Sequence, residues 1–459
     1  MHSFALRSGA RGIKARVTVK LPNPKSKIQN GKGLFMSVGV GIIGAGTVGG
    51  GVIKTLLSHR EMIAQKAGIN IVLRRVAELR PERLAEFDLP AATFTTDAEA
   101  LINDPSVDIV CELIGGVGTA KRLILKALNA KKNVVTANKM LLAHAGPELC
   151  RAAAGNGVEL RYEASVAGGI PIIKALREGL AANRIDFIYG ILNGTCNYIL
   201  SRMTYEGLEF QAALAQAQRL GFAETPPDLD VEGLDTAHKC QILATLCFSA
   251  DVSLDDIYVE GITKVTHNDV AYALEMGYLI KLLAIIRGVD GEIEARVHPT
   301  LVPEDHLLAS VRNEFNAVYA KGDVVGATLY YGRGAGRMPT ASAVIADIID
   351  IARRDGAPAP PPFLYINQAK VRDIGRVVGR YYLRLTTRDM PGVLGKVCTI
   401  LGEHGVSIAS CIQKERHETD LVHVVLMTHE TVECALRAAL DEIDIHDFIG
   451  EETHVLRVL

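Results

Sequence analysis

The segment VGVGIIGAGTVGGGVIKTLL, residues 38–57, determines how the first part of the chain folds. An apolar run typical of a buried strand leads into the motif GAGTVG, residues 44–49, and then into an apolar helical pattern. In this position the first glycine permits a tight turn, the second lets the backbone approach a pyrophosphate, and the third allows the helix to pack closely on the strand. A Gly-rich turn without a ligand is the alternative. The residues expected to bind a dinucleotide are Gly44, Gly46, Thr47, Val48 and Gly49.

Further apolar runs follow this motif and alternate with helical stretches. We expect a helix from Thr47 to about Lys66, and strands over residues 69–77, 107–113 and 133–136. Strands that alternate with helices in this way predict a parallel, doubly wound sheet with helices on both faces. The first domain is therefore predicted to be an α/β domain of the Rossmann type.

Polar residues follow these strands, at the edge where open α/β sheets place their ligands. Glu78 would hold a ribose diol, whereas Arg80 or Arg83 would accept a 2′-phosphate, so both NAD and NADP remain possible. The alternative is that Glu78, Arg80 and Arg83 are ordinary solvated charges on the surface and bind no cofactor. Gly115 follows the third strand, and Lys139 follows the fourth. Lys139 would face the cofactor and the substrate, unless it is an ordinary surface lysine.

The densest group of charges is ETPPDLDVEGLDTAHK, residues 224–239, which we call the acidic segment. It holds five carboxylates within twelve residues, and its two prolines force a loop. Asp235 and Lys239 then lie one helical turn apart, a spacing that an ordinary helix ion pair also has. Because partial burial moves the pKa of a lysine toward the operating pH, the segment is a candidate for acid–base chemistry and for binding a cationic amine.

The last 80 residues begin a new pattern after a Pro-rich run and a polar stretch. The pattern is strand, helix, strand, strand, helix, strand, which is the βαββαβ order of a ferredoxin-like unit. It contains no nucleophile constellation, so we expect a self-contained sensing unit. The expected parts are a basic, disordered extension (1–36), the Rossmann domain (37–166, completed by about 335–360), an α+β substrate-binding and dimerisation domain (167–334), a linker (361–379) and the βαββαβ domain (380–459).

The composition limits the class of protein. The 459 residues are 48% apolar and 22% charged, as in folded globular chains. The first 35 residues hold eight Lys and Arg and no acid, so the rest carries 42 Lys and Arg against 52 Asp and Glu, a net charge of −10. Such an acidic body is a poor candidate for binding nucleic acid. Eight scattered cysteines and the lack of an apolar run of about 20 residues predict a cytoplasmic protein without a membrane partner.

Several longer motifs extend this interpretation. They are ANK at 137–139, EASVAGGIPII at 163–173, GILNGTCNYIL at 190–200, the acidic segment, and GAG at 334–336 followed by PTASAV at 339–344. In this order they resemble the homoserine dehydrogenase family, over about residues 37–360. The resemblance implies reversible, NAD(P)-dependent interconversion of L-homoserine and L-aspartate 4-semialdehyde.

The resemblance also implies roles for single residues. Lys239 matches the proton donor and acceptor of the family, beside Asp235. Glu224 and Asp230 match carboxylates that bind the substrate near its amino group. Lys139 matches a lysine that lies between the cofactor and the substrate.

Other positions implied by the resemblance concern the cofactor, a cation and one departure from the family. Gly334 is expected at the cofactor. The family has an Asp two residues after the first Glu of the acidic segment, but this chain has Pro226 at that position. The carboxylate of Asp228 lies two residues further along the chain, so it is not equivalent to the Asp of the family. The expected ligands of a Na⁺ ion are Glu163 and the carbonyl oxygens of Val166, Gly168 and Ile170.

The tail resembles an ACT domain, a small-ligand regulatory module, through RDMPGVL at 388–394. This implies feedback inhibition by an amino-acid end product, for which we expect L-threonine, bound at Asp389 and Gly392. We expect a homodimer or homotetramer. Two other functions are considered, namely a catalytically silent, nucleotide-dependent amino-acid sensor and another amino-acid-pathway dehydrogenase. The charge cluster of the acidic segment argues against the silent sensor.

Overall fold

The computed structural model describes residues 37–354, 367–368, 370–414 and 421–459. The basic extension expected over 1–36 and residues 361–366 of the expected linker lie outside the described residues. No helix of the described part combines the length and the apolar character that crossing a membrane requires.

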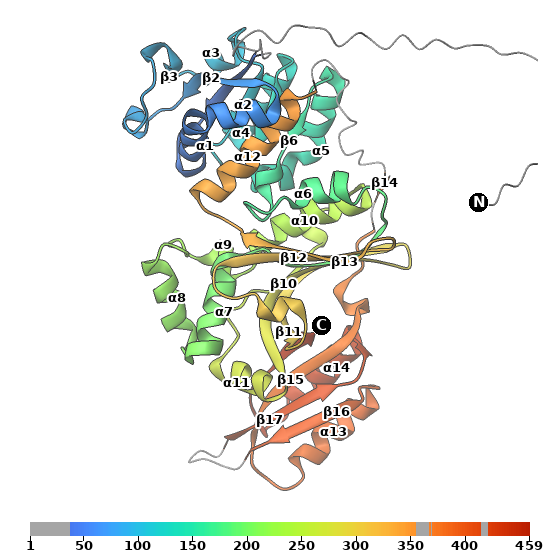
Figure 1. Ribbon diagram of the computed structural model, residues 1–459. Coiled ribbons are helices and arrows are strands. Elements are labelled where there is room, and N and C mark those ends of the chain that lie inside the picture. The colour runs from blue at the N-terminus through green and yellow to red at the C-terminus, as the bar shows by residue number, and fades with distance from the viewer. Residues whose placement is uncertain (1–36, 355–366, 369, 415–420) are drawn as a thin grey trace, which may run out of the picture. The chain divides into compact units, whose positions relative to one another are not determined.

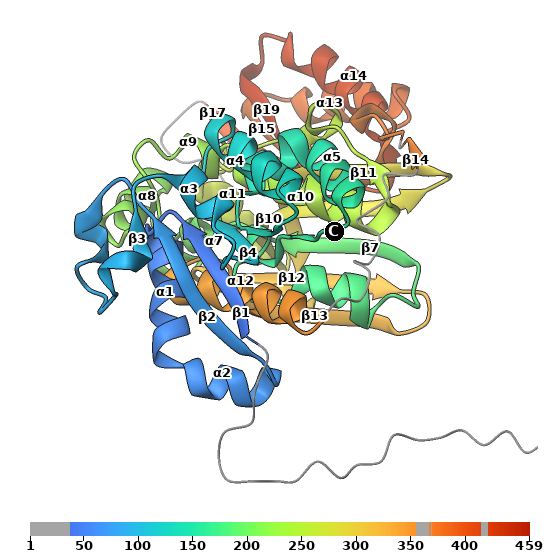
Figure 2. The same ribbon diagram turned by 90° about the horizontal axis from the view of Figure 1, so that it is seen from above.

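In the described part of the chain, the first domain is built on a six-stranded parallel sheet with the order β3-β2-β1-β4-β5-β6. Helices α1, α2 and α12 pack on one face, and α3, α4 and α5 pack on the other (Figures 1 and 2). The predicted doubly wound α/β fold is therefore confirmed. The strands are β1 (Ser37–Ile43), β2 (Asn70–Ala77), β3 (Phe94–Thr95), β4 (Ile109–Glu112), β5 (Asn133–Thr136) and β6 (Leu160–Arg161). The helices are α1 (Thr47–Ser58), α2 (Arg60–Ala67), α3 (Ala98–Asn103), α4 (Gly118–Asn129), α5 (Lys139–Asn156) and α12 (Arg337–Ala352).

The helix expected from Thr47 to about Lys66 is two helices. His59 leaves the helical conformation, with φ −113° and ψ 15°, and separates α1 from α2. The short α2 buries a single apolar side chain, Ile63, and ends at Gly68 in the left-handed conformation. The prediction of one continuous helix was therefore wrong at this point.

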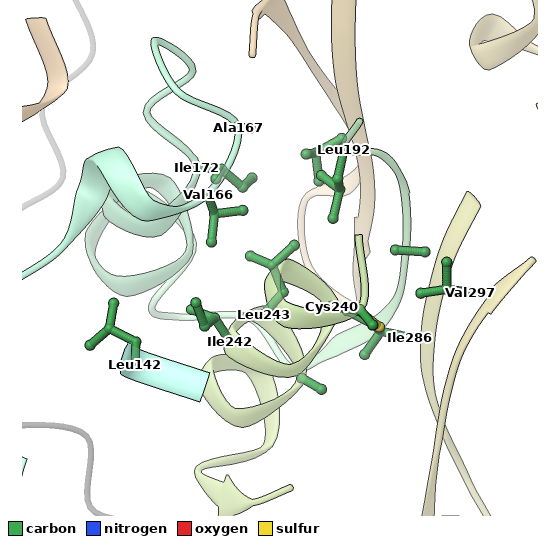
Figure 3. Close-up of a cluster of buried hydrophobic side chains, with 14 of the residues drawn as sticks. Leu142, Val166, Ala167, Ile172, Leu192, Cys240, Ile242, Leu243, Ile286 and Val297 are labelled. Carbon is green, nitrogen blue, oxygen red and sulfur yellow. The ribbon is translucent and has the colours of Figure 1, made fainter. Parts of the chain in front are cut away.

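Helix α10 (Leu234–Phe248) of the central domain lies between the first domain and the sheet of the central domain. Its residues from Asp235 to Ala244 are buried on every side. Apolar side chains of α10 pack against α5 and against β10 and β11, as Figure 3 shows for Leu243 and its neighbours. Because α10 is buried on every side, the polar residues at its start, Asp235 and Lys239 among them, must find their partners inside the protein.

The remaining elements of the central domain form a mixed sheet with helices on one side. Its strands are β7 (Ile185–Ile191), β9 (Tyr258–Val259), β10 (Tyr278–Val289), β11 (Glu292–Pro303), β12 (Phe315–Gly322) and β13 (Gly326–Arg333). Its helices are α6 (Ile172–Lys174), α7 (Gly194–Glu206), α8 (Phe210–Arg219), α9 (Asp228–Val231) and α11 (His267–Glu275). A short pair joins β8 (Ala250–Asp251) to β14 (Asn367–Gln368).

The C-terminal domain has the predicted βαββαβ order and adds a short strand. Its sheet order is β19-β15-β17-β16, and the helices are antiparallel neighbours on one face. The elements are β15 (Val378–Arg388), α13 (Val393–Glu403), β16 (Ile408–Gln413), β17 (Leu421–Thr428), β18 (Thr431–Val432), α14 (Glu433–Asp444) and β19 (Ile449–Val458).

This domain is not self-contained, which corrects the expectation from sequence. Strand β19 pairs in parallel with β11 at Thr300 and Leu301, so both domains share one continuous sheet. Tyr382 and Leu456 of the C-terminal domain belong to the same apolar cluster as the central domain. The shared core arises because apolar side chains on this face of the C-terminal sheet have no helix of their own domain to cover them.

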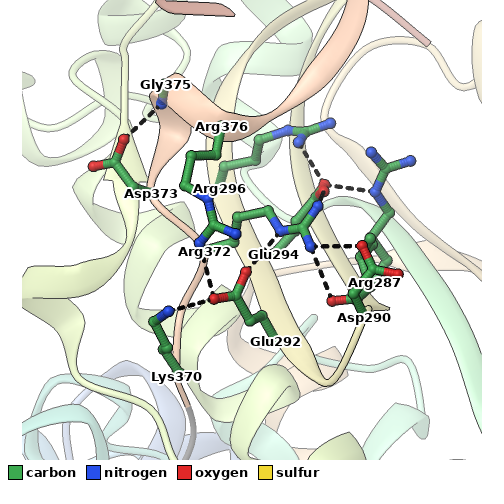
Figure 4. Close-up of polar contacts among 11 residues, drawn as sticks. Arg287, Asp290, Glu292, Glu294, Arg296, Lys370, Arg372, Asp373, Gly375 and Arg376 are labelled. Carbon is green, nitrogen blue, oxygen red and sulfur yellow. Dashed lines mark hydrogen bonds and ion pairs between the residues drawn. The ribbon is translucent and has the colours of Figure 1, made fainter. Parts of the chain in front are cut away.

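The second half of the expected linker is bound to the β10–β11 hairpin. Lys370, Arg372 and Arg376 converge on Glu292, at 2.6, 3.0 and 2.9 Å respectively (Figure 4). Hydrogen bonds from these three side chains lower the pKa of Glu292 to about 2. The basic residues of this stretch therefore fix the chain on the central domain before β15 begins.

Candidate active site

A cavity of about 920 Å³ opens at the carboxyl edge of the parallel sheet. Its walls are the motif after β1, the end of β2 and the turns after β4 and β5. This volume lies in the range of about 300–1,000 Å³ that is usual for cofactor sites. The predicted cofactor residues that line it are Gly44, Gly46, Thr47, Val48, Arg80 and Gly115.

The motif after β1 has the geometry of a pyrophosphate cradle. Gly44 has a φ of +94°, which favours glycine. A Cβ on Gly49 would lie 1.9 Å from the carbonyl oxygen of Gly44, so the helix packs on the strand as closely as the sequence predicted. A Cβ on Gly46 would meet only Arg83, at 3.5 Å, among the described residues. The open first turn of α1 therefore suits a phosphate group.

Glu78, at the end of β2, holds this motif from behind. Its carboxylate accepts the N–H of Ala45 at 2.7 Å and the N–H of Arg80 at 3.0 Å, and Arg83 lies 3.5 Å away. Burial raises the pKa of Glu78, but the two backbone hydrogen bonds and the charge of Arg83 outweigh it and lower the pKa. Both carboxylate oxygens are thus engaged, while the Arg80 and Arg83 side chains line the cavity.

Sequence analysis did not identify Glu112 and Asn138, which shape the opposite wall. Glu112 accepts the N–H of Gly115 at 3.2 Å and the hydroxyl of Thr136 at 2.7 Å. The Asn138 side chain donates to the carbonyl of Gly116 at 2.6 Å. The sequence showed a carboxylate, Glu112, at the end of a buried strand. It did not show that this side chain points to the turn at Gly115 and to Thr136.

Three of the predicted charged residues meet beside this wall. Lys239 Nζ, on α10, donates to Asp235 Oδ2 at 2.6 Å and to the carbonyl oxygen of Leu192 at 2.7 Å. Lys139, which follows Asn138 and begins α5, forms an ion pair with the other oxygen of Asp235. Lys239 and Asp235 are both 7% exposed. The first and central domains therefore contribute one lysine each to the same carboxylate.

The environment gives the two lysines different proton affinities. Burial lowers the pKa of Lys239, and Lys139 lowers it further, although Asp235 opposes this. For Lys139, burial also lowers the pKa, but Asp235 outweighs it and the net shift is upward. Burial raises the pKa of Asp235, yet both lysines lower it more, so Asp235 stays ionised. Lys239 is therefore the lysine that more readily gives up a proton.

Asn193 is a third residue that sequence analysis missed. Its Nδ2 donates to Asp230 Oδ1 at 2.7 Å and to Asp235 Oδ2 at 2.9 Å, and its Oδ1 accepts the N–H of Cys196 as the N-cap of α7. An Asn at the start of a predicted helix signals the cap, but the bridge between two carboxylates needs the tertiary structure. Burial raises the pKa of Asp230, and Asn193 partly offsets this.

The outer end of the acidic segment is open to solvent. Glu224 is exposed, and its charge is among those that raise the pKa of Lys139. Asp228 begins α9 and is exposed, as is Pro226 at the position where the family has an Asp. The charges of Glu224 and Asp230 in this segment therefore act on Lys139, whereas Asp228 lies at an exposed position.

The residues expected around Na⁺ lie where the chain passes between the two domains. The Glu163 carboxylate accepts the N–H of Ile173 at 2.9 Å and of Lys174 at 2.7 Å, and burial raises its pKa. A Cβ on Gly168 would lie 2.4 Å from the carbonyl oxygen of Gly334. Gly334 therefore packs on this segment, and it is not among the residues that line the cavity. No cluster of three or more His, Cys, Asp and Glu suited to a metal occurs in the described ranges.

The two expected effector residues lie at the turn between β15 and α13. Gly392 has a φ of +90° and is the N-cap of α13, and no side chain caps this helix among the described residues. Asp389 is exposed in the same turn. The N–H of Val393, the first residue of this eleven-residue helix, donates to the carbonyl oxygen of Met390 at 3.3 Å, and no side chain caps the amides of Leu394 and Gly395 among the described residues.

Comparison with known proteins agrees with this arrangement. Family models match residues 171–349 (homoserine dehydrogenase), 44–163 (homoserine dehydrogenase, NAD binding domain) and 381–444 (ACT domain). The homoserine dehydrogenase of Pseudomonas aeruginosa is 46% identical over 429 residues, which are 92% of this chain and 98% of that protein. The Bacillus subtilis enzyme is 40% identical over 428 residues, again 92% and 98%.

Solved structures give the same result. The crystal structure of a homoserine dehydrogenase from Thiobacillus denitrificans has a TM-score of 0.88 and 42% identity, and the match covers 93% of this chain and 99% of that one. A hyperthermophilic archaeal homoserine dehydrogenase in complex with NADPH has a TM-score of 0.58 and 25% identity, over 71% of this chain and all of that one. Matches of this extent, over a cofactor cavity that adjoins a buried lysine and carboxylate, place the chain in the homoserine dehydrogenase family, as an NAD(P)-dependent oxidoreductase with a C-terminal ACT domain.

Proposed function

We propose that the chain interconverts L-homoserine and L-aspartate 4-semialdehyde, with Lys239 as the proton donor and acceptor. The observation that carries this proposal is the contact of Lys239 and Lys139 with one carboxylate, Asp235, directly beside the cofactor cavity. Asn138 lines that cavity and Lys139 is the next residue, which supports a substrate site beside the two lysines.

A nicotinamide cofactor in this cavity would supply or accept the hydride. The glycine motif, Arg80 and Gly115 would hold it, since the open helix turn fits its pyrophosphate. The Lys239 ammonium uses two of its three N–H donors on Asp235 and Leu192, and the third would donate to the substrate oxygen. In aldehyde reduction the ammonium form donates a proton to the developing alkoxide. In alcohol oxidation the neutral amine takes that proton back, and burial favours this form.

The acidic segment would bind the amino end of the substrate. The charges of Asp230 and Glu224 both act on Lys139, and an ammonium group bound by the two carboxylates would neutralise their charge. The test of the whole assignment is formation of reduced cofactor, followed by absorbance, with L-homoserine and with 4-hydroxybutyrate, which lacks the amino group. We expect turnover with L-homoserine alone. Equal rates with both alcohols would refute the assignment.

Replacement of Glu224 by Gln is expected to raise the KM for homoserine about 10-fold with little change in kcat. A carboxylate that binds the substrate ammonium stabilises the ground state and the transition state equally, so its loss raises KM and leaves kcat little changed. Steady-state kinetics with homoserine varied at saturating NADP measures both constants. The matched control is Asp228→Asn, an exposed carboxylate of the same segment, which should leave KM unchanged. An unchanged KM in Glu224→Gln removes Glu224 from the site.

We also infer a preference for NADP. Glu78, Arg80 and Arg83 all line the cavity at the end of β2, but the Glu78 carboxylate already accepts two backbone amides and pairs with Arg83, which leaves Arg80 as the residue to bind a 2′-phosphate. Arg80→Ala is expected to lower the preference for NADP over NAD by about 10-fold or more, because a charge-assisted contact to phosphate is lost. Arg122 lines the same cavity but pairs with Glu99, so Arg122→Ala is the control. Ratios of kcat/KM for the two cofactors decide this, and an unaltered ratio in Arg80→Ala excludes the phosphate role.

We propose Na⁺ as a structural ion near Glu163. The carboxylate and the carbonyl oxygens of Val166, Gly168 and Ile170 are hard oxygen donors from one short segment, and such donors suit this ion. They would hold it where the two domains join. Melting curves in NaCl and in choline chloride at equal ionic strength test this, since an ion bound only by the folded state raises Tm. Identical Tm values in both salts would contradict the proposal.

We propose that L-threonine inhibits the enzyme through the ACT domain. After the turn from Asp389 to Gly392, the amides of Leu394 and Gly395 at the start of α13 have no side-chain cap and would suit the carboxylate of an amino acid. Calorimetric titration of L-threonine into the full chain, with and without Asp389→Ala, measures binding, and the rate of homoserine oxidation measures inhibition. No heat of binding to the unchanged chain would reject threonine as the effector.

We further propose that the chain forms a homodimer or homotetramer through the central sheet. The outward face of its edge strand β13 exposes Leu329 and Tyr331, at 36% and 55%. A sheet face of this kind is typical of a surface that a second copy covers. Light scattering of Tyr331→Glu and of the unchanged chain tests the assembly. A particle of monomer mass for the unchanged chain would exclude it.

A further inference from the structure

The contact between the ACT domain and the central domain includes a route to the acidic segment. Strand β9 pairs in parallel with β11 at Arg296 and Val297, and β19 pairs in parallel with β11 at Thr300 and Leu301. The other edge of β11 is occupied along its length by β10. Strands β9 and β19 therefore follow each other along the same edge.

We call residues 258–262 the strap. The strap begins with β9 and then turns away from β11 toward the acidic segment. The Glu260 N–H donates to the carbonyl oxygen of Val297 at 2.8 Å, and the Ile262 N–H donates to the carbonyl oxygen of Val231 at 2.8 Å. One hydrogen bond thus anchors the strap to the sheet, and the other anchors it to α9.

The strap also touches the acidic segment closely through its glycine. A Cβ on Gly261 would lie 2.3 Å from the carbonyl oxygen of Val231 and 2.5 Å from Glu232 Cα, so only glycine fits there. A Cβ on Gly233 would lie 3.3 Å from Val259. Val231 and Gly233 lie between Asp230 and Asp235. A shift of the strap would therefore move the backbone that carries both carboxylates.

On its other side the strap is held by the ACT domain. Arg457, in β19, forms an ion pair with Glu260 at 2.8 Å and places its guanidinium over the ring of Tyr258, 4.6 Å from the centroid. Tyr258 donates its hydroxyl to Glu260 at 2.9 Å. Arg457 is itself fixed by a buried pair with Glu433 at the start of α14. The strap is thus tied to the first turn of an ACT helix through one arginine.

We propose that Glu260 and Arg457 are a positioning pair for the acidic segment, through which the ACT domain sets the affinity for the amino-acid substrate. This inference rests on the proposed role of the acidic segment in binding that substrate. Neither residue touches the reacting atoms. Loss of the pair frees the strap, and the Asp230 and Asp235 carboxylates then lose their fixed spacing, while the cofactor cavity in the first domain keeps all its contacts.

A second ion pair between the same domains provides a matched control. Asp269, at the start of α11, is fully buried and accepts Arg384 Nε of β15 at 2.7 Å and the hydroxyl of Tyr382 at 3.0 Å. It joins the ACT domain to the central domain as Glu260 does, but it does not contact the strap. Glu260→Gln and Asp269→Asn each remove one carboxylate charge with little change of shape.

The test compares these two variants with the unchanged chain by steady-state kinetics and by hydrogen exchange. Glu260→Gln is expected to raise KM for homoserine at least about 3-fold, with KM for NADP unchanged. The amides of residues 228–236 should exchange faster in Glu260→Gln and at the original rate in Asp269→Asn. If Asp269→Asn does not fold, Arg384→Lys replaces it as the control.

Exchange at residues 228–236 that remains unchanged in Glu260→Gln would overturn the positioning role, whatever KM does. The same increase of KM in both variants would also overturn it, since general loosening of the domain contact would then suffice. A wild-type chain that does not oxidise homoserine would instead refute the proposed function. Hydrogen exchange would still decide the inference in that case, because it does not depend on turnover.

Discussion

Lys239→Ala is expected to lower kcat for homoserine oxidation by about 10²–10⁴-fold, the usual contribution of a general acid or base. The hydroxyl proton would have no acceptor at the position that Lys239 Nζ occupies between Asp235 and the carbonyl of Leu192. Binding of NADP should remain unchanged, since Lys239 is not among the residues that line the cofactor cavity. Single-turnover kinetics and fluorescence titration of the cofactor measure the two effects separately.

The control for this variant is a second buried lysine. Lys281 is 1% exposed, donates to Asn197 at 3.2 Å and to the carbonyl of Val311, and has a pKa that burial lowers to about 7. Lys281→Met should lower Tm and leave kcat of the folded enzyme unchanged. A near-normal kcat in Lys239→Ala would exclude its role in proton transfer.

The pH dependence of homoserine oxidation follows from the same site. If Lys239 accepts the proton as proposed, oxidation needs its neutral amine, so kcat/KM should rise with pH and level off above the pKa of Lys239. Burial places that pKa below the usual value of lysine, so the rise should begin at lower pH than for an exposed lysine. A profile that is flat where the amine titrates would be inconsistent with this assignment.

Removal of residues 377–459 is expected to abolish the folded, active enzyme. The cut would remove β19 from the edge of β11 and take away Tyr382, Val425, Met427 and Leu456 from the central apolar cluster. Burial of each such side chain contributes about 1.5–3 kcal/mol, against a total stability of about 5–15 kcal/mol. The loss is comparable to the whole stability, and the open edge of β11 would favour aggregation.

Circular dichroism melting and activity of the truncated chain measure this outcome. The full-length variant Asp389→Asn is the control, since it changes the expected effector turn and keeps the shared sheet. A soluble truncated chain with normal kcat would contradict the expectation. The sequence pattern alone presented the tail as a separate unit that follows a linker. On that pattern, a chain without the tail would be an active enzyme that is no longer regulated.

Local patterns explain what could be predicted from the sequence. The strand, glycine motif and helix around Gly44 are adjacent in sequence, so their period and spacing define both the fold and the cofactor cradle. Asp235 and Lys239 share one helix face, and their ion pair followed from that spacing. The βαββαβ order of the tail is likewise a succession of neighbouring elements.

The features that the sequence did not predict depend on contacts between distant residues. The parallel pairing of Thr300 with Arg457 requires the register of two strands in different domains. Glu78 lines the cavity where the sequence suggested a ribose, but its hydrogen bond to the N–H of Ala45 could not be seen in the sequence. Asn193 caps its helix and also joins two carboxylates, and only the first role is a local property.

The position of Arg457 in the chain also affects when the active site can be completed during synthesis. Arg457 emerges 197 residues after its partner Glu260. At about 5–20 residues per second, a ribosome needs about 10–40 s to make that stretch. Late in this interval, once α12 has been made, a nascent chain has all elements of the cofactor-binding domain and every residue of the acidic segment, but the strap has no arginine to hold it. On the proposed role of this pair, we expect homoserine oxidation to become efficient only after the regulatory domain has been made.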